Sequence, residues 1–176
     1  MKSGTQKEQL DGMMKRPIPR KRIGIIRLEM IKEGSMLCGM RRFSGPGEAA
    51  EMIRPLVKNR DRELMLVLSL DSKLQPMALE IVAVGGVDYC AVDVKNMFKH
   101  ALLNNASYLI CFHNHPSGVS EASRDDILIT KRIQKAGDIL GIRLLDHIII
   151  GSADYFSLKE HGDFNERADE QSVSVA

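Results

Sequence analysis

Residues 108–118 read YLICFHNHPSG, an apolar run that ends in two histidines and a turn. The apolar part predicts a short buried strand. If the strand continues through His113 and His115, both imidazoles lie on one face, because successive side chains of a strand point to opposite faces. The proline and glycine that follow predict a loop. The stretch therefore predicts a strand that places two histidines side by side at its end.

Two further polar residues follow this loop. Ser123 is a good helix N-cap, and the apolar spacing after it predicts a helix to about Leu140, with Gly141 as its stop. Asp126 falls in the first turn of that helix and so faces the same loop as the histidines. Two neutral imidazoles and one carboxylate leave a fourth position for water, which is typical of a catalytic zinc site. The alternative is that Ser123 and Asp126 form only a capping box.

The rest of the chain predicts alternating strands and helices. Strands are expected at residues 23–30, 64–70, 77–84 and 144–150, and helices at residues 47–57, 92–104 and 123–140, with one helical turn at 155–159. Residues 64–70 and 77–84 are nearly all apolar and flank a turn, so they predict a hairpin of two buried strands. We therefore expect an α/β (α+β) fold in which a mixed sheet is flanked by helices.

Composition and charge indicate the domain organisation and the class of protein. The 176 residues, 44% of them apolar, predict one domain at residues 23–162 with a basic flexible arm at 1–22 and a polar tail at 163–176. A net charge of +2 gives little support to a nucleic-acid partner, although the arm leaves that contact open. Three cysteines without a CxxC pair favour the reducing cytoplasm. No apolar run reaches the ~20 residues of a membrane span, and the oligomeric state is left open.

A hydrolytic zinc site also needs a carboxylate that takes a proton from water and passes it to the leaving amine. Glu80 is the first candidate, because it lies inside an apolar strand, where an ionised carboxylate is costly unless it is paired or functional. The alternative is an edge strand in which Glu80 faces water. Glu63, at the start of the preceding strand, is the second candidate, and a solvated strand end explains it as well.

Three other side chains near these residues have simpler explanations. Asp125 is adjacent to Asp126, but its place in the first turn suits a partner of the helix dipole. Cys111 precedes His113 on the same strand and is expected to be a small buried hydrophobe. As a fourth ligand it would close the site. His147 lies in an apolar strand and is expected to be a satisfied core histidine.

The complete pattern resembles a known family. Glu80 with His113-x-His115-x7-Ser123-x2-Asp126 resembles the JAMM motif of the JAB/MPN metalloproteases. The strings ALLNNA at 101–106, HNHPSG at 113–118 and LDHIIIG at 145–151 resemble the RadC branch of that superfamily. The resemblance covers about residues 44–162. No helix-hairpin-helix region is found ahead of it, so the chain is similar to a short RadC-like form.

The resemblance implies a JAB/MPN-like fold with a mostly antiparallel sheet and a zinc-dependent metallopeptidase or isopeptidase activity. It implies that His113, His115 and Asp126 bind zinc. Glu80 would hold the zinc-activated water, and Ser123 would stabilise the oxyanion that forms at an amide carbonyl. The implied partner is a polypeptide substrate. The alternatives are a non-catalytic MPN-type scaffold and a DNA-repair-associated binding protein.

Overall fold

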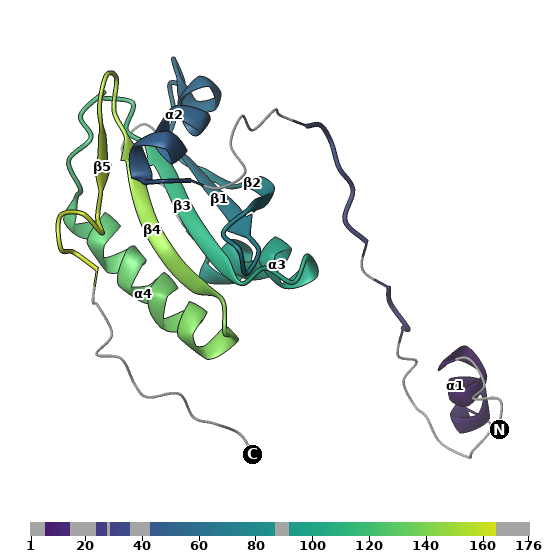
Figure 1. Cartoon of the computed structure of the whole chain (residues 1–176). Helices are drawn as coiled ribbons and strands as arrows, with labels where there is room; N and C mark the ends of the chain where they lie inside the picture. The colour runs from purple at the N-terminus through teal and green to yellow at the C-terminus, as the bar shows by residue number, and fades with distance from the viewer. Residues whose placement is uncertain (1–5, 15–23, 28, 36–42, 87–91, 165–176) are drawn as a thin grey trace, which may run out of the picture. The chain divides into compact units, whose positions relative to one another are not determined.

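A computed structural model of the chain describes residues 6–14, 24–27, 29–35, 43–86 and 92–164 (Figure 1). They belong to two compact units, residues 1–32 and 33–176. The first unit contains helix α1 (Gln6–Met14), which the sequence analysis did not predict. Much of the predicted arm and most of the predicted tail lie outside the described residues.

The strand predicted at residues 23–30 is wrong for the residues that the structure describes. Residues 24–27, 29 and 30 are exposed and belong to no strand. Ile25 and Ile26 have the β-branched side chains that suit a strand, but that preference depends on a neighbouring strand and a packed face. An apolar run alone therefore did not establish a strand here.

The second unit is built on a five-stranded sheet with the order β2-β1-β3-β4-β5. The strands are β1 (Leu64–Leu70), β2 (Pro76–Val84), β3 (Tyr108–Asn114), β4 (Arg143–Ile150) and β5 (Tyr155–Ser157). All neighbouring pairs are antiparallel except β3 and β4, which are parallel. This confirms the predicted mixed, mostly antiparallel sheet. Strand β5 corrects the helical turn predicted at 155–159, because Tyr155–Ser157 pair with β4 and extend the sheet.

Helices cover both faces of the sheet. Helix α2 (Pro46–Val57) packs on one face, and α3 (Val94–Leu103) and α4 (Arg124–Leu140) pack on the other. Strand β1 alternates between the two cores: Leu64, Leu66, Leu68 and Leu70 face α2, whereas Met65 and Val67 face α3 and α4. All of β1 is buried, as its apolar sequence predicted.

Strand β2 forms the predicted hairpin with β1 but is not the buried strand that its composition predicted. It lies at the edge of the sheet, and Met77, Glu80, Ile81 and Val84 are exposed. An apolar sequence does not distinguish an edge strand from a central one, because burial depends on which elements cover it. The alternative of an edge strand with an exposed Glu80 is therefore confirmed.

Helix α4 carries the chain between the parallel strands β3 and β4, a connection that a tight hairpin cannot make. Its predicted caps are confirmed: Ser123 is the N-cap, and Gly141 is the C-cap with a φ of 71°. That left-handed backbone is favourable mainly for glycine. The β3–α4 connection brings the end of β3 next to the first turn of α4, where the candidate residues lie. No described helix is both long and apolar enough to cross a membrane.

Candidate metal centre

Three side chains converge where β3 ends and α4 begins. His113 is the penultimate residue of β3, and His115 follows the strand. His113 Nε2 lies 3.0 Å from His115 Nε2. The Asp126 carboxylate lies 3.2 Å from His113 Nε2 through Oδ1 and 3.5 Å from His115 Nε2 through Oδ2. Among the described residues, these three form the one group whose ligand atoms are close enough together to hold a metal ion.

The capping box of α4 positions Asp126. The backbone N–H of Ser123 donates to Asp126 Oδ2 at 2.7 Å, and the Ser123 hydroxyl donates to the same oxygen at 2.6 Å. The Asp126 N–H donates back to Ser123 Oγ at 3.1 Å. The capping-box interpretation is thus confirmed, and it is compatible with a metal-binding role because Oδ1 still faces His113. Burial raises the pKa of the Asp126 carboxyl, but His113 and His115 more than offset this and hold the pKa well below its ordinary value.

A chain of buried hydrogen bonds determines which nitrogen of His113 faces this group. The Thr130 hydroxyl donates its one hydrogen to the Asp126 carbonyl at 2.6 Å, so Oγ1 accepts from His147 Nδ1 at 2.6 Å. Burial lowers the pKa of His147 to about 3, so its ring is neutral and Nε2 has a lone pair. His147 Nε2 therefore accepts from His113 Nδ1 at 2.8 Å. The hydrogen on Nδ1 leaves the lone pair of His113 Nε2 directed at the metal-binding group.

His115 is oriented in the same way by a backbone carbonyl. Its Nδ1 lies 2.8 Å from the Val119 carbonyl oxygen, which can only accept, so Nδ1 carries the hydrogen and Nε2 faces the group. The loop is closed by the Gly118 N–H, which donates to the His115 carbonyl at 2.9 Å. Gly118 has a φ of 83°, and an added Cβ would meet Ser152 Oγ at 2.2 Å, so only glycine fits this turn.

These donors fit a zinc ion. Two imidazole lone pairs that face each other at 3.0 Å, beside an ionised carboxylate, repel unless a proton or a metal cation lies between them. The neighbouring Asp126 carboxylate raises the pKa of His115, which favours positive charge at this position. Two neutral imidazoles and one carboxylate form a three-ligand set of the catalytic zinc type. The predicted ligands His113, His115 and Asp126 are therefore brought together.

Glu63, the second candidate for the general base, lies beside this group. Its Oε1 is 4.0 Å from His115 Nε2, and its side chain is 14% exposed. The interpretation of Glu63 as a solvated strand end is therefore wrong. Strand pairing explains its place: Glu63 immediately precedes β1, whose Met65 is paired with His113 of β3.

Asn114 fixes the backbone on both sides of Glu63. Its Oδ1 accepts from the Leu64 N–H at 2.9 Å, and its Nδ2 donates to the Arg62 carbonyl at 3.1 Å. The Glu63 backbone is also bonded to the end of the β1–β2 hairpin, through the Gly86 carbonyl at 3.1 Å and the Gly85 N–H at 2.8 Å. Asn114 is the residue between His113 and His115. One short stretch therefore contains both histidines and the side chain that fixes the backbone around Glu63.

Glu80, the first candidate, lies away from the metal-binding group. It is on β2, which is two strands away from β3, and strands are spaced by about 4.8 Å. Its side chain is 45% exposed, and Oε2 lies 3.0 Å from His100 Nδ1 on α3. The predicted burial of Glu80 is wrong because β2 is an edge strand. Its carboxylate is directed at His100 on α3 and not at His113 and His115.

The other neighbouring residues follow the simpler explanations. Cys111 is fully buried in the core between the sheet and the helices α3 and α4, and burial raises the pKa of its thiol well above its ordinary value. A thiol that stays protonated is not a metal ligand, so the expectation of a buried hydrophobe is confirmed. Asp125 is exposed and lies outside the metal-binding group. His147 is a core histidine as expected, but its bond to His113 is one that the sequence analysis missed.

The chain is similar to known proteins across most of this unit. A model of the RadC-like JAB domain matches residues 43–163. A UPF0758 protein of Methanosarcina mazei is 38% identical over 122 residues, which cover 69% of this chain and 53% of that relative. A UPF0758 protein of Listeria monocytogenes serotype 4b is 42% identical over 119 residues, covering 68% of this chain and 53% of the relative. The chain thus spans about half the length of these curated relatives.

Proposed function

The chain belongs to the RadC-like JAB domain family, and from this premise we propose that it is a zinc-dependent metallohydrolase that cleaves a peptide or isopeptide bond. One observation carries the proposal. The side chains of His113, His115 and Asp126 present their metal-binding atoms to one another, and hydrogen bonds behind both rings direct the lone pairs inward. A purely structural role for these residues does not need that orientation.

His113, His115 and Asp126 would hold the metal. When bound, zinc supplies the Lewis acidity that activates water for attack on an amide carbonyl near neutral pH. The three protein ligands carry one negative charge between them, on Asp126. His113 lies at the end of β3, His115 directly after it and Asp126 in the first turn of α4, and a hydrogen bond orients each side chain, which suits a site that has to keep its geometry.

We assign the proton transfer to Glu63 in place of Glu80. The Glu63 carboxylate would take a proton from the attacking water and deliver it to the nitrogen of the leaving amine. Its support is its place 4.0 Å from His115 Nε2 and its low exposure, whereas Glu80 is exposed and paired with His100. The bonds of Asn114 to Leu64 and Arg62 hold the backbone on either side of Glu63 in place.

Ser123 would stabilise the oxyanion that develops on the substrate carbonyl. Its hydroxyl donates to Asp126 Oδ2 in this structure. To donate to a substrate oxygen, the hydroxyl has to rotate while the backbone N–H of Ser123 keeps its own bond to Asp126. A donor aimed at developing charge is the kind of group whose loss costs about 10²–10³ in rate.

The test combines metal analysis with peptide hydrolysis. Zinc content is measured for the wild-type chain, His113→Ala and Asp126→Ala, and cleavage of a peptide library is followed by mass spectrometry. The glutamates Glu63 and Glu80 form a matched pair for the same Glu→Gln change. We expect Glu63→Gln to retain zinc and lose about 10²–10⁴ in rate, and Glu80→Gln to cleave like the wild type.

Each contrary result has a distinct meaning. Full zinc content in both ligand variants would overturn the metal centre. Loss of cleavage in Glu80→Gln, with normal cleavage in Glu63→Gln, would return the proton transfer to Glu80. Zinc binding without cleavage of any library peptide would support the non-catalytic scaffold.

A further inference from the structure

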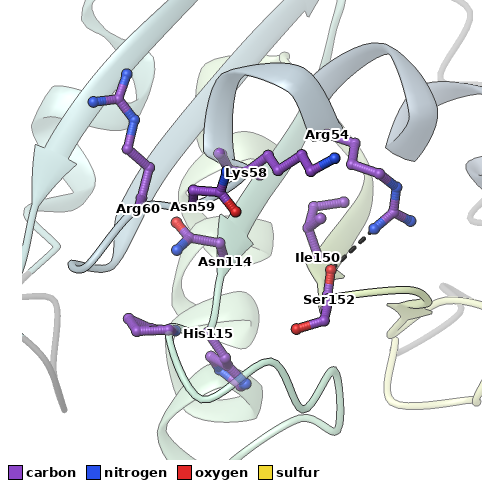
Figure 2. A pocket seen from close by; sticks show the side chains of 11 residues that line it. Arg54, Lys58, Asn59, Arg60, Asn114, His115, Ile150 and Ser152 are labelled. Carbon is purple, nitrogen blue, oxygen red and sulfur yellow. Dashed lines mark hydrogen bonds between the residues drawn. The ribbon is translucent and has the colours of Figure 1, made fainter.

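A pocket of about 220 Å³ is lined in part by His115, one residue of the metal-binding group (Figure 2). His115 and Asn114 form part of its wall, so the pocket shares His115 with the candidate metal centre. The opposite wall comes from the end of α2 and the loop that follows it. A group bound here would lie next to an amide held at His115.

The pocket is lined by positive charge. Arg54, Lys58 and Arg60 all line it, and none of the described lining residues is acidic. Lys58 and Arg60 are exposed, and the structure shows no ion pair for either among the described residues. In Figure 2 the Lys58 side chain extends toward Arg54, while Arg60 stands on the other side of Asn59. Such an arrangement attracts an anion.

Arg54 gives the pocket a rigid wall. Its Nη1 donates to the Gly151 carbonyl at 2.9 Å, Nη2 donates to the Asp154 carbonyl at 3.2 Å, and Nε donates to Glu51 Oε1 at 2.8 Å. A guanidinium has five N–H donors, and the described part of the chain uses three of them, which leaves two for a ligand. Because Arg54 joins α2 to the turn after β4, the pocket has a fixed shape before any ligand binds.

The rest of the lining suits a short aliphatic stem. Val57, Pro116 and Ile150 supply apolar surface beside the basic groups. Pockets for drug-sized ligands measure roughly 300–1,000 Å³, so this smaller one suits a single side chain or a chain end. A nucleic-acid duplex presents closely spaced phosphates along an extended surface, and this pocket offers one small concave patch.

We propose that this pocket binds a carboxylate of the polypeptide substrate, next to the bond that is cleaved. This inference rests on the proposed function and names its substrate class. The carboxylate belongs either to an aspartate or glutamate side chain or to a free C-terminus. Lys58 and Arg60 attract the charge, and the free N–H groups of Arg54 bind it.

The test measures binding to the zinc-supplemented full chain by amide NMR titration, with signals of residues 58–60, 114 and 115 as reporters. The probes are acetyl-Ala-Glu-Ala-amide, its neutral isostere acetyl-Ala-Gln-Ala-amide, acetyl-Ala-Gln-Ala with a free carboxylate, and a twelve-nucleotide single-stranded DNA. We expect at least one carboxylate peptide to bind about tenfold more tightly than the neutral peptide, as charge-assisted hydrogen bonds predict. The two acidic peptides separate a side-chain carboxylate from a C-terminal one.

Two matched variants test the assignment to this pocket. Lys58→Gln combined with Arg60→Gln should reduce the preference for the carboxylate to less than about threefold. Lys135→Gln combined with Arg132→Gln removes the same two charges from the exposed face of α4 and should leave the preference intact. Lys58→Glu, which reverses one charge, should favour the neutral peptide.

Equal binding of the acidic and neutral peptides would overturn the inference, as would equal losses in the two double variants. Tighter binding of the DNA, lost only in the pocket variant, would assign the pocket to nucleic acid and would also overturn it. Failure of the proposed function appears differently: the carboxylate preference stays, and no peptide is cleaved. Cleavage with no preference for acidic residues would leave the proposed function standing and remove only the pocket assignment.

Discussion

His147 Nε2 accepts a hydrogen bond of 2.8 Å from His113 Nδ1, and both atoms are buried. The direction of this bond follows from Thr130, whose hydrogen goes to the Asp126 carbonyl. The contact therefore connects three elements: β3 with His113, β4 with His147 and α4 with Thr130. His147 lies outside the metal-binding group, yet it determines which ring nitrogen of His113 faces that group.

We predict that His147→Leu lowers the zinc affinity about 10–100-fold, which is typical when the hydrogen-bond partner of a metal-ligating histidine is removed. The measurement is competition with a chromogenic zinc chelator, with folding checked by circular dichroism. His147→Gln retains an acceptor for His113 Nδ1 and should recover part of the affinity. An unchanged affinity in a folded His147→Leu would show that His113 needs no such partner.

Asn114→Ala should separate positioning from metal binding. It removes the acceptor of the Leu64 N–H, which is buried, and the donor to the Arg62 carbonyl. We expect the free energy of unfolding to fall by about 1–3 kcal/mol, the usual cost of an unsatisfied buried polar group. Hydrolysis should fall while zinc affinity stays close to wild type, because Glu63 is displaced and the ligands are not. Asn114→Asp keeps one acceptor and should be intermediate; equal hydrolysis in all three chains would contradict the positioning role.

Ser123→Ala should lower both stability and activity. Loss of the N-cap of α4 costs about 1 kcal/mol in urea unfolding, and loss of the oxyanion donor costs about 10²–10³ in the rate of hydrolysis. Asp93 provides the matched control, since it caps α3 by accepting from the Lys95 N–H at 3.0 Å and lies outside the metal-binding group. Asp93→Ala should lose similar stability and keep its activity. If the two variants lose activity equally, Ser123 acts through stability alone.

The three residues of the metal-binding group could be predicted as candidates because they are close in sequence. His113 lies at the end of β3, His115 follows that strand directly, and Asp126 lies in the first turn of the next helix, so local periodicity and capping were sufficient to identify them. The alternation of strands and helices likewise predicted the mixed sheet. These features depend on short-range geometry, which a single sequence contains.

The place of Glu63 beside the metal-binding group depends on long-range pairing, so the sequence favoured Glu80 over Glu63 as the candidate general base. Glu63 reaches His115 only because β1 pairs with β3, with Met65 opposite His113. No local pattern reports that register. Glu80 was favoured because its neighbours are apolar, but the position of β2 at the sheet edge exposes it. The bond between His113 and His147 was missed for the same reason, since it joins two strands across the sheet.

The contact between Glu80 and His100 gives the last prediction, which concerns pH. Burial lowers the pKa of His100 below its ordinary value of 6.5, and the Glu80 carboxylate partly offsets this shift. Below pH 6.5 the unfolded chain therefore binds more protons at this residue than the folded chain does, so the free energy of unfolding falls as the pH decreases.

Urea unfolding of the metal-free chain at pH 7 and pH 5.5 tests this pH dependence. Between these two pH values, the free energy of unfolding should fall less in His100→Gln than in the wild type, because glutamine binds no proton. Glu80→Gln should show a larger loss than the wild type, because removing the carboxylate lowers the pKa of His100 further. Equal losses in all three chains would show that acid sensitivity arises elsewhere, and a smaller loss in Glu80→Gln would show that Glu80 acts on stability by another route.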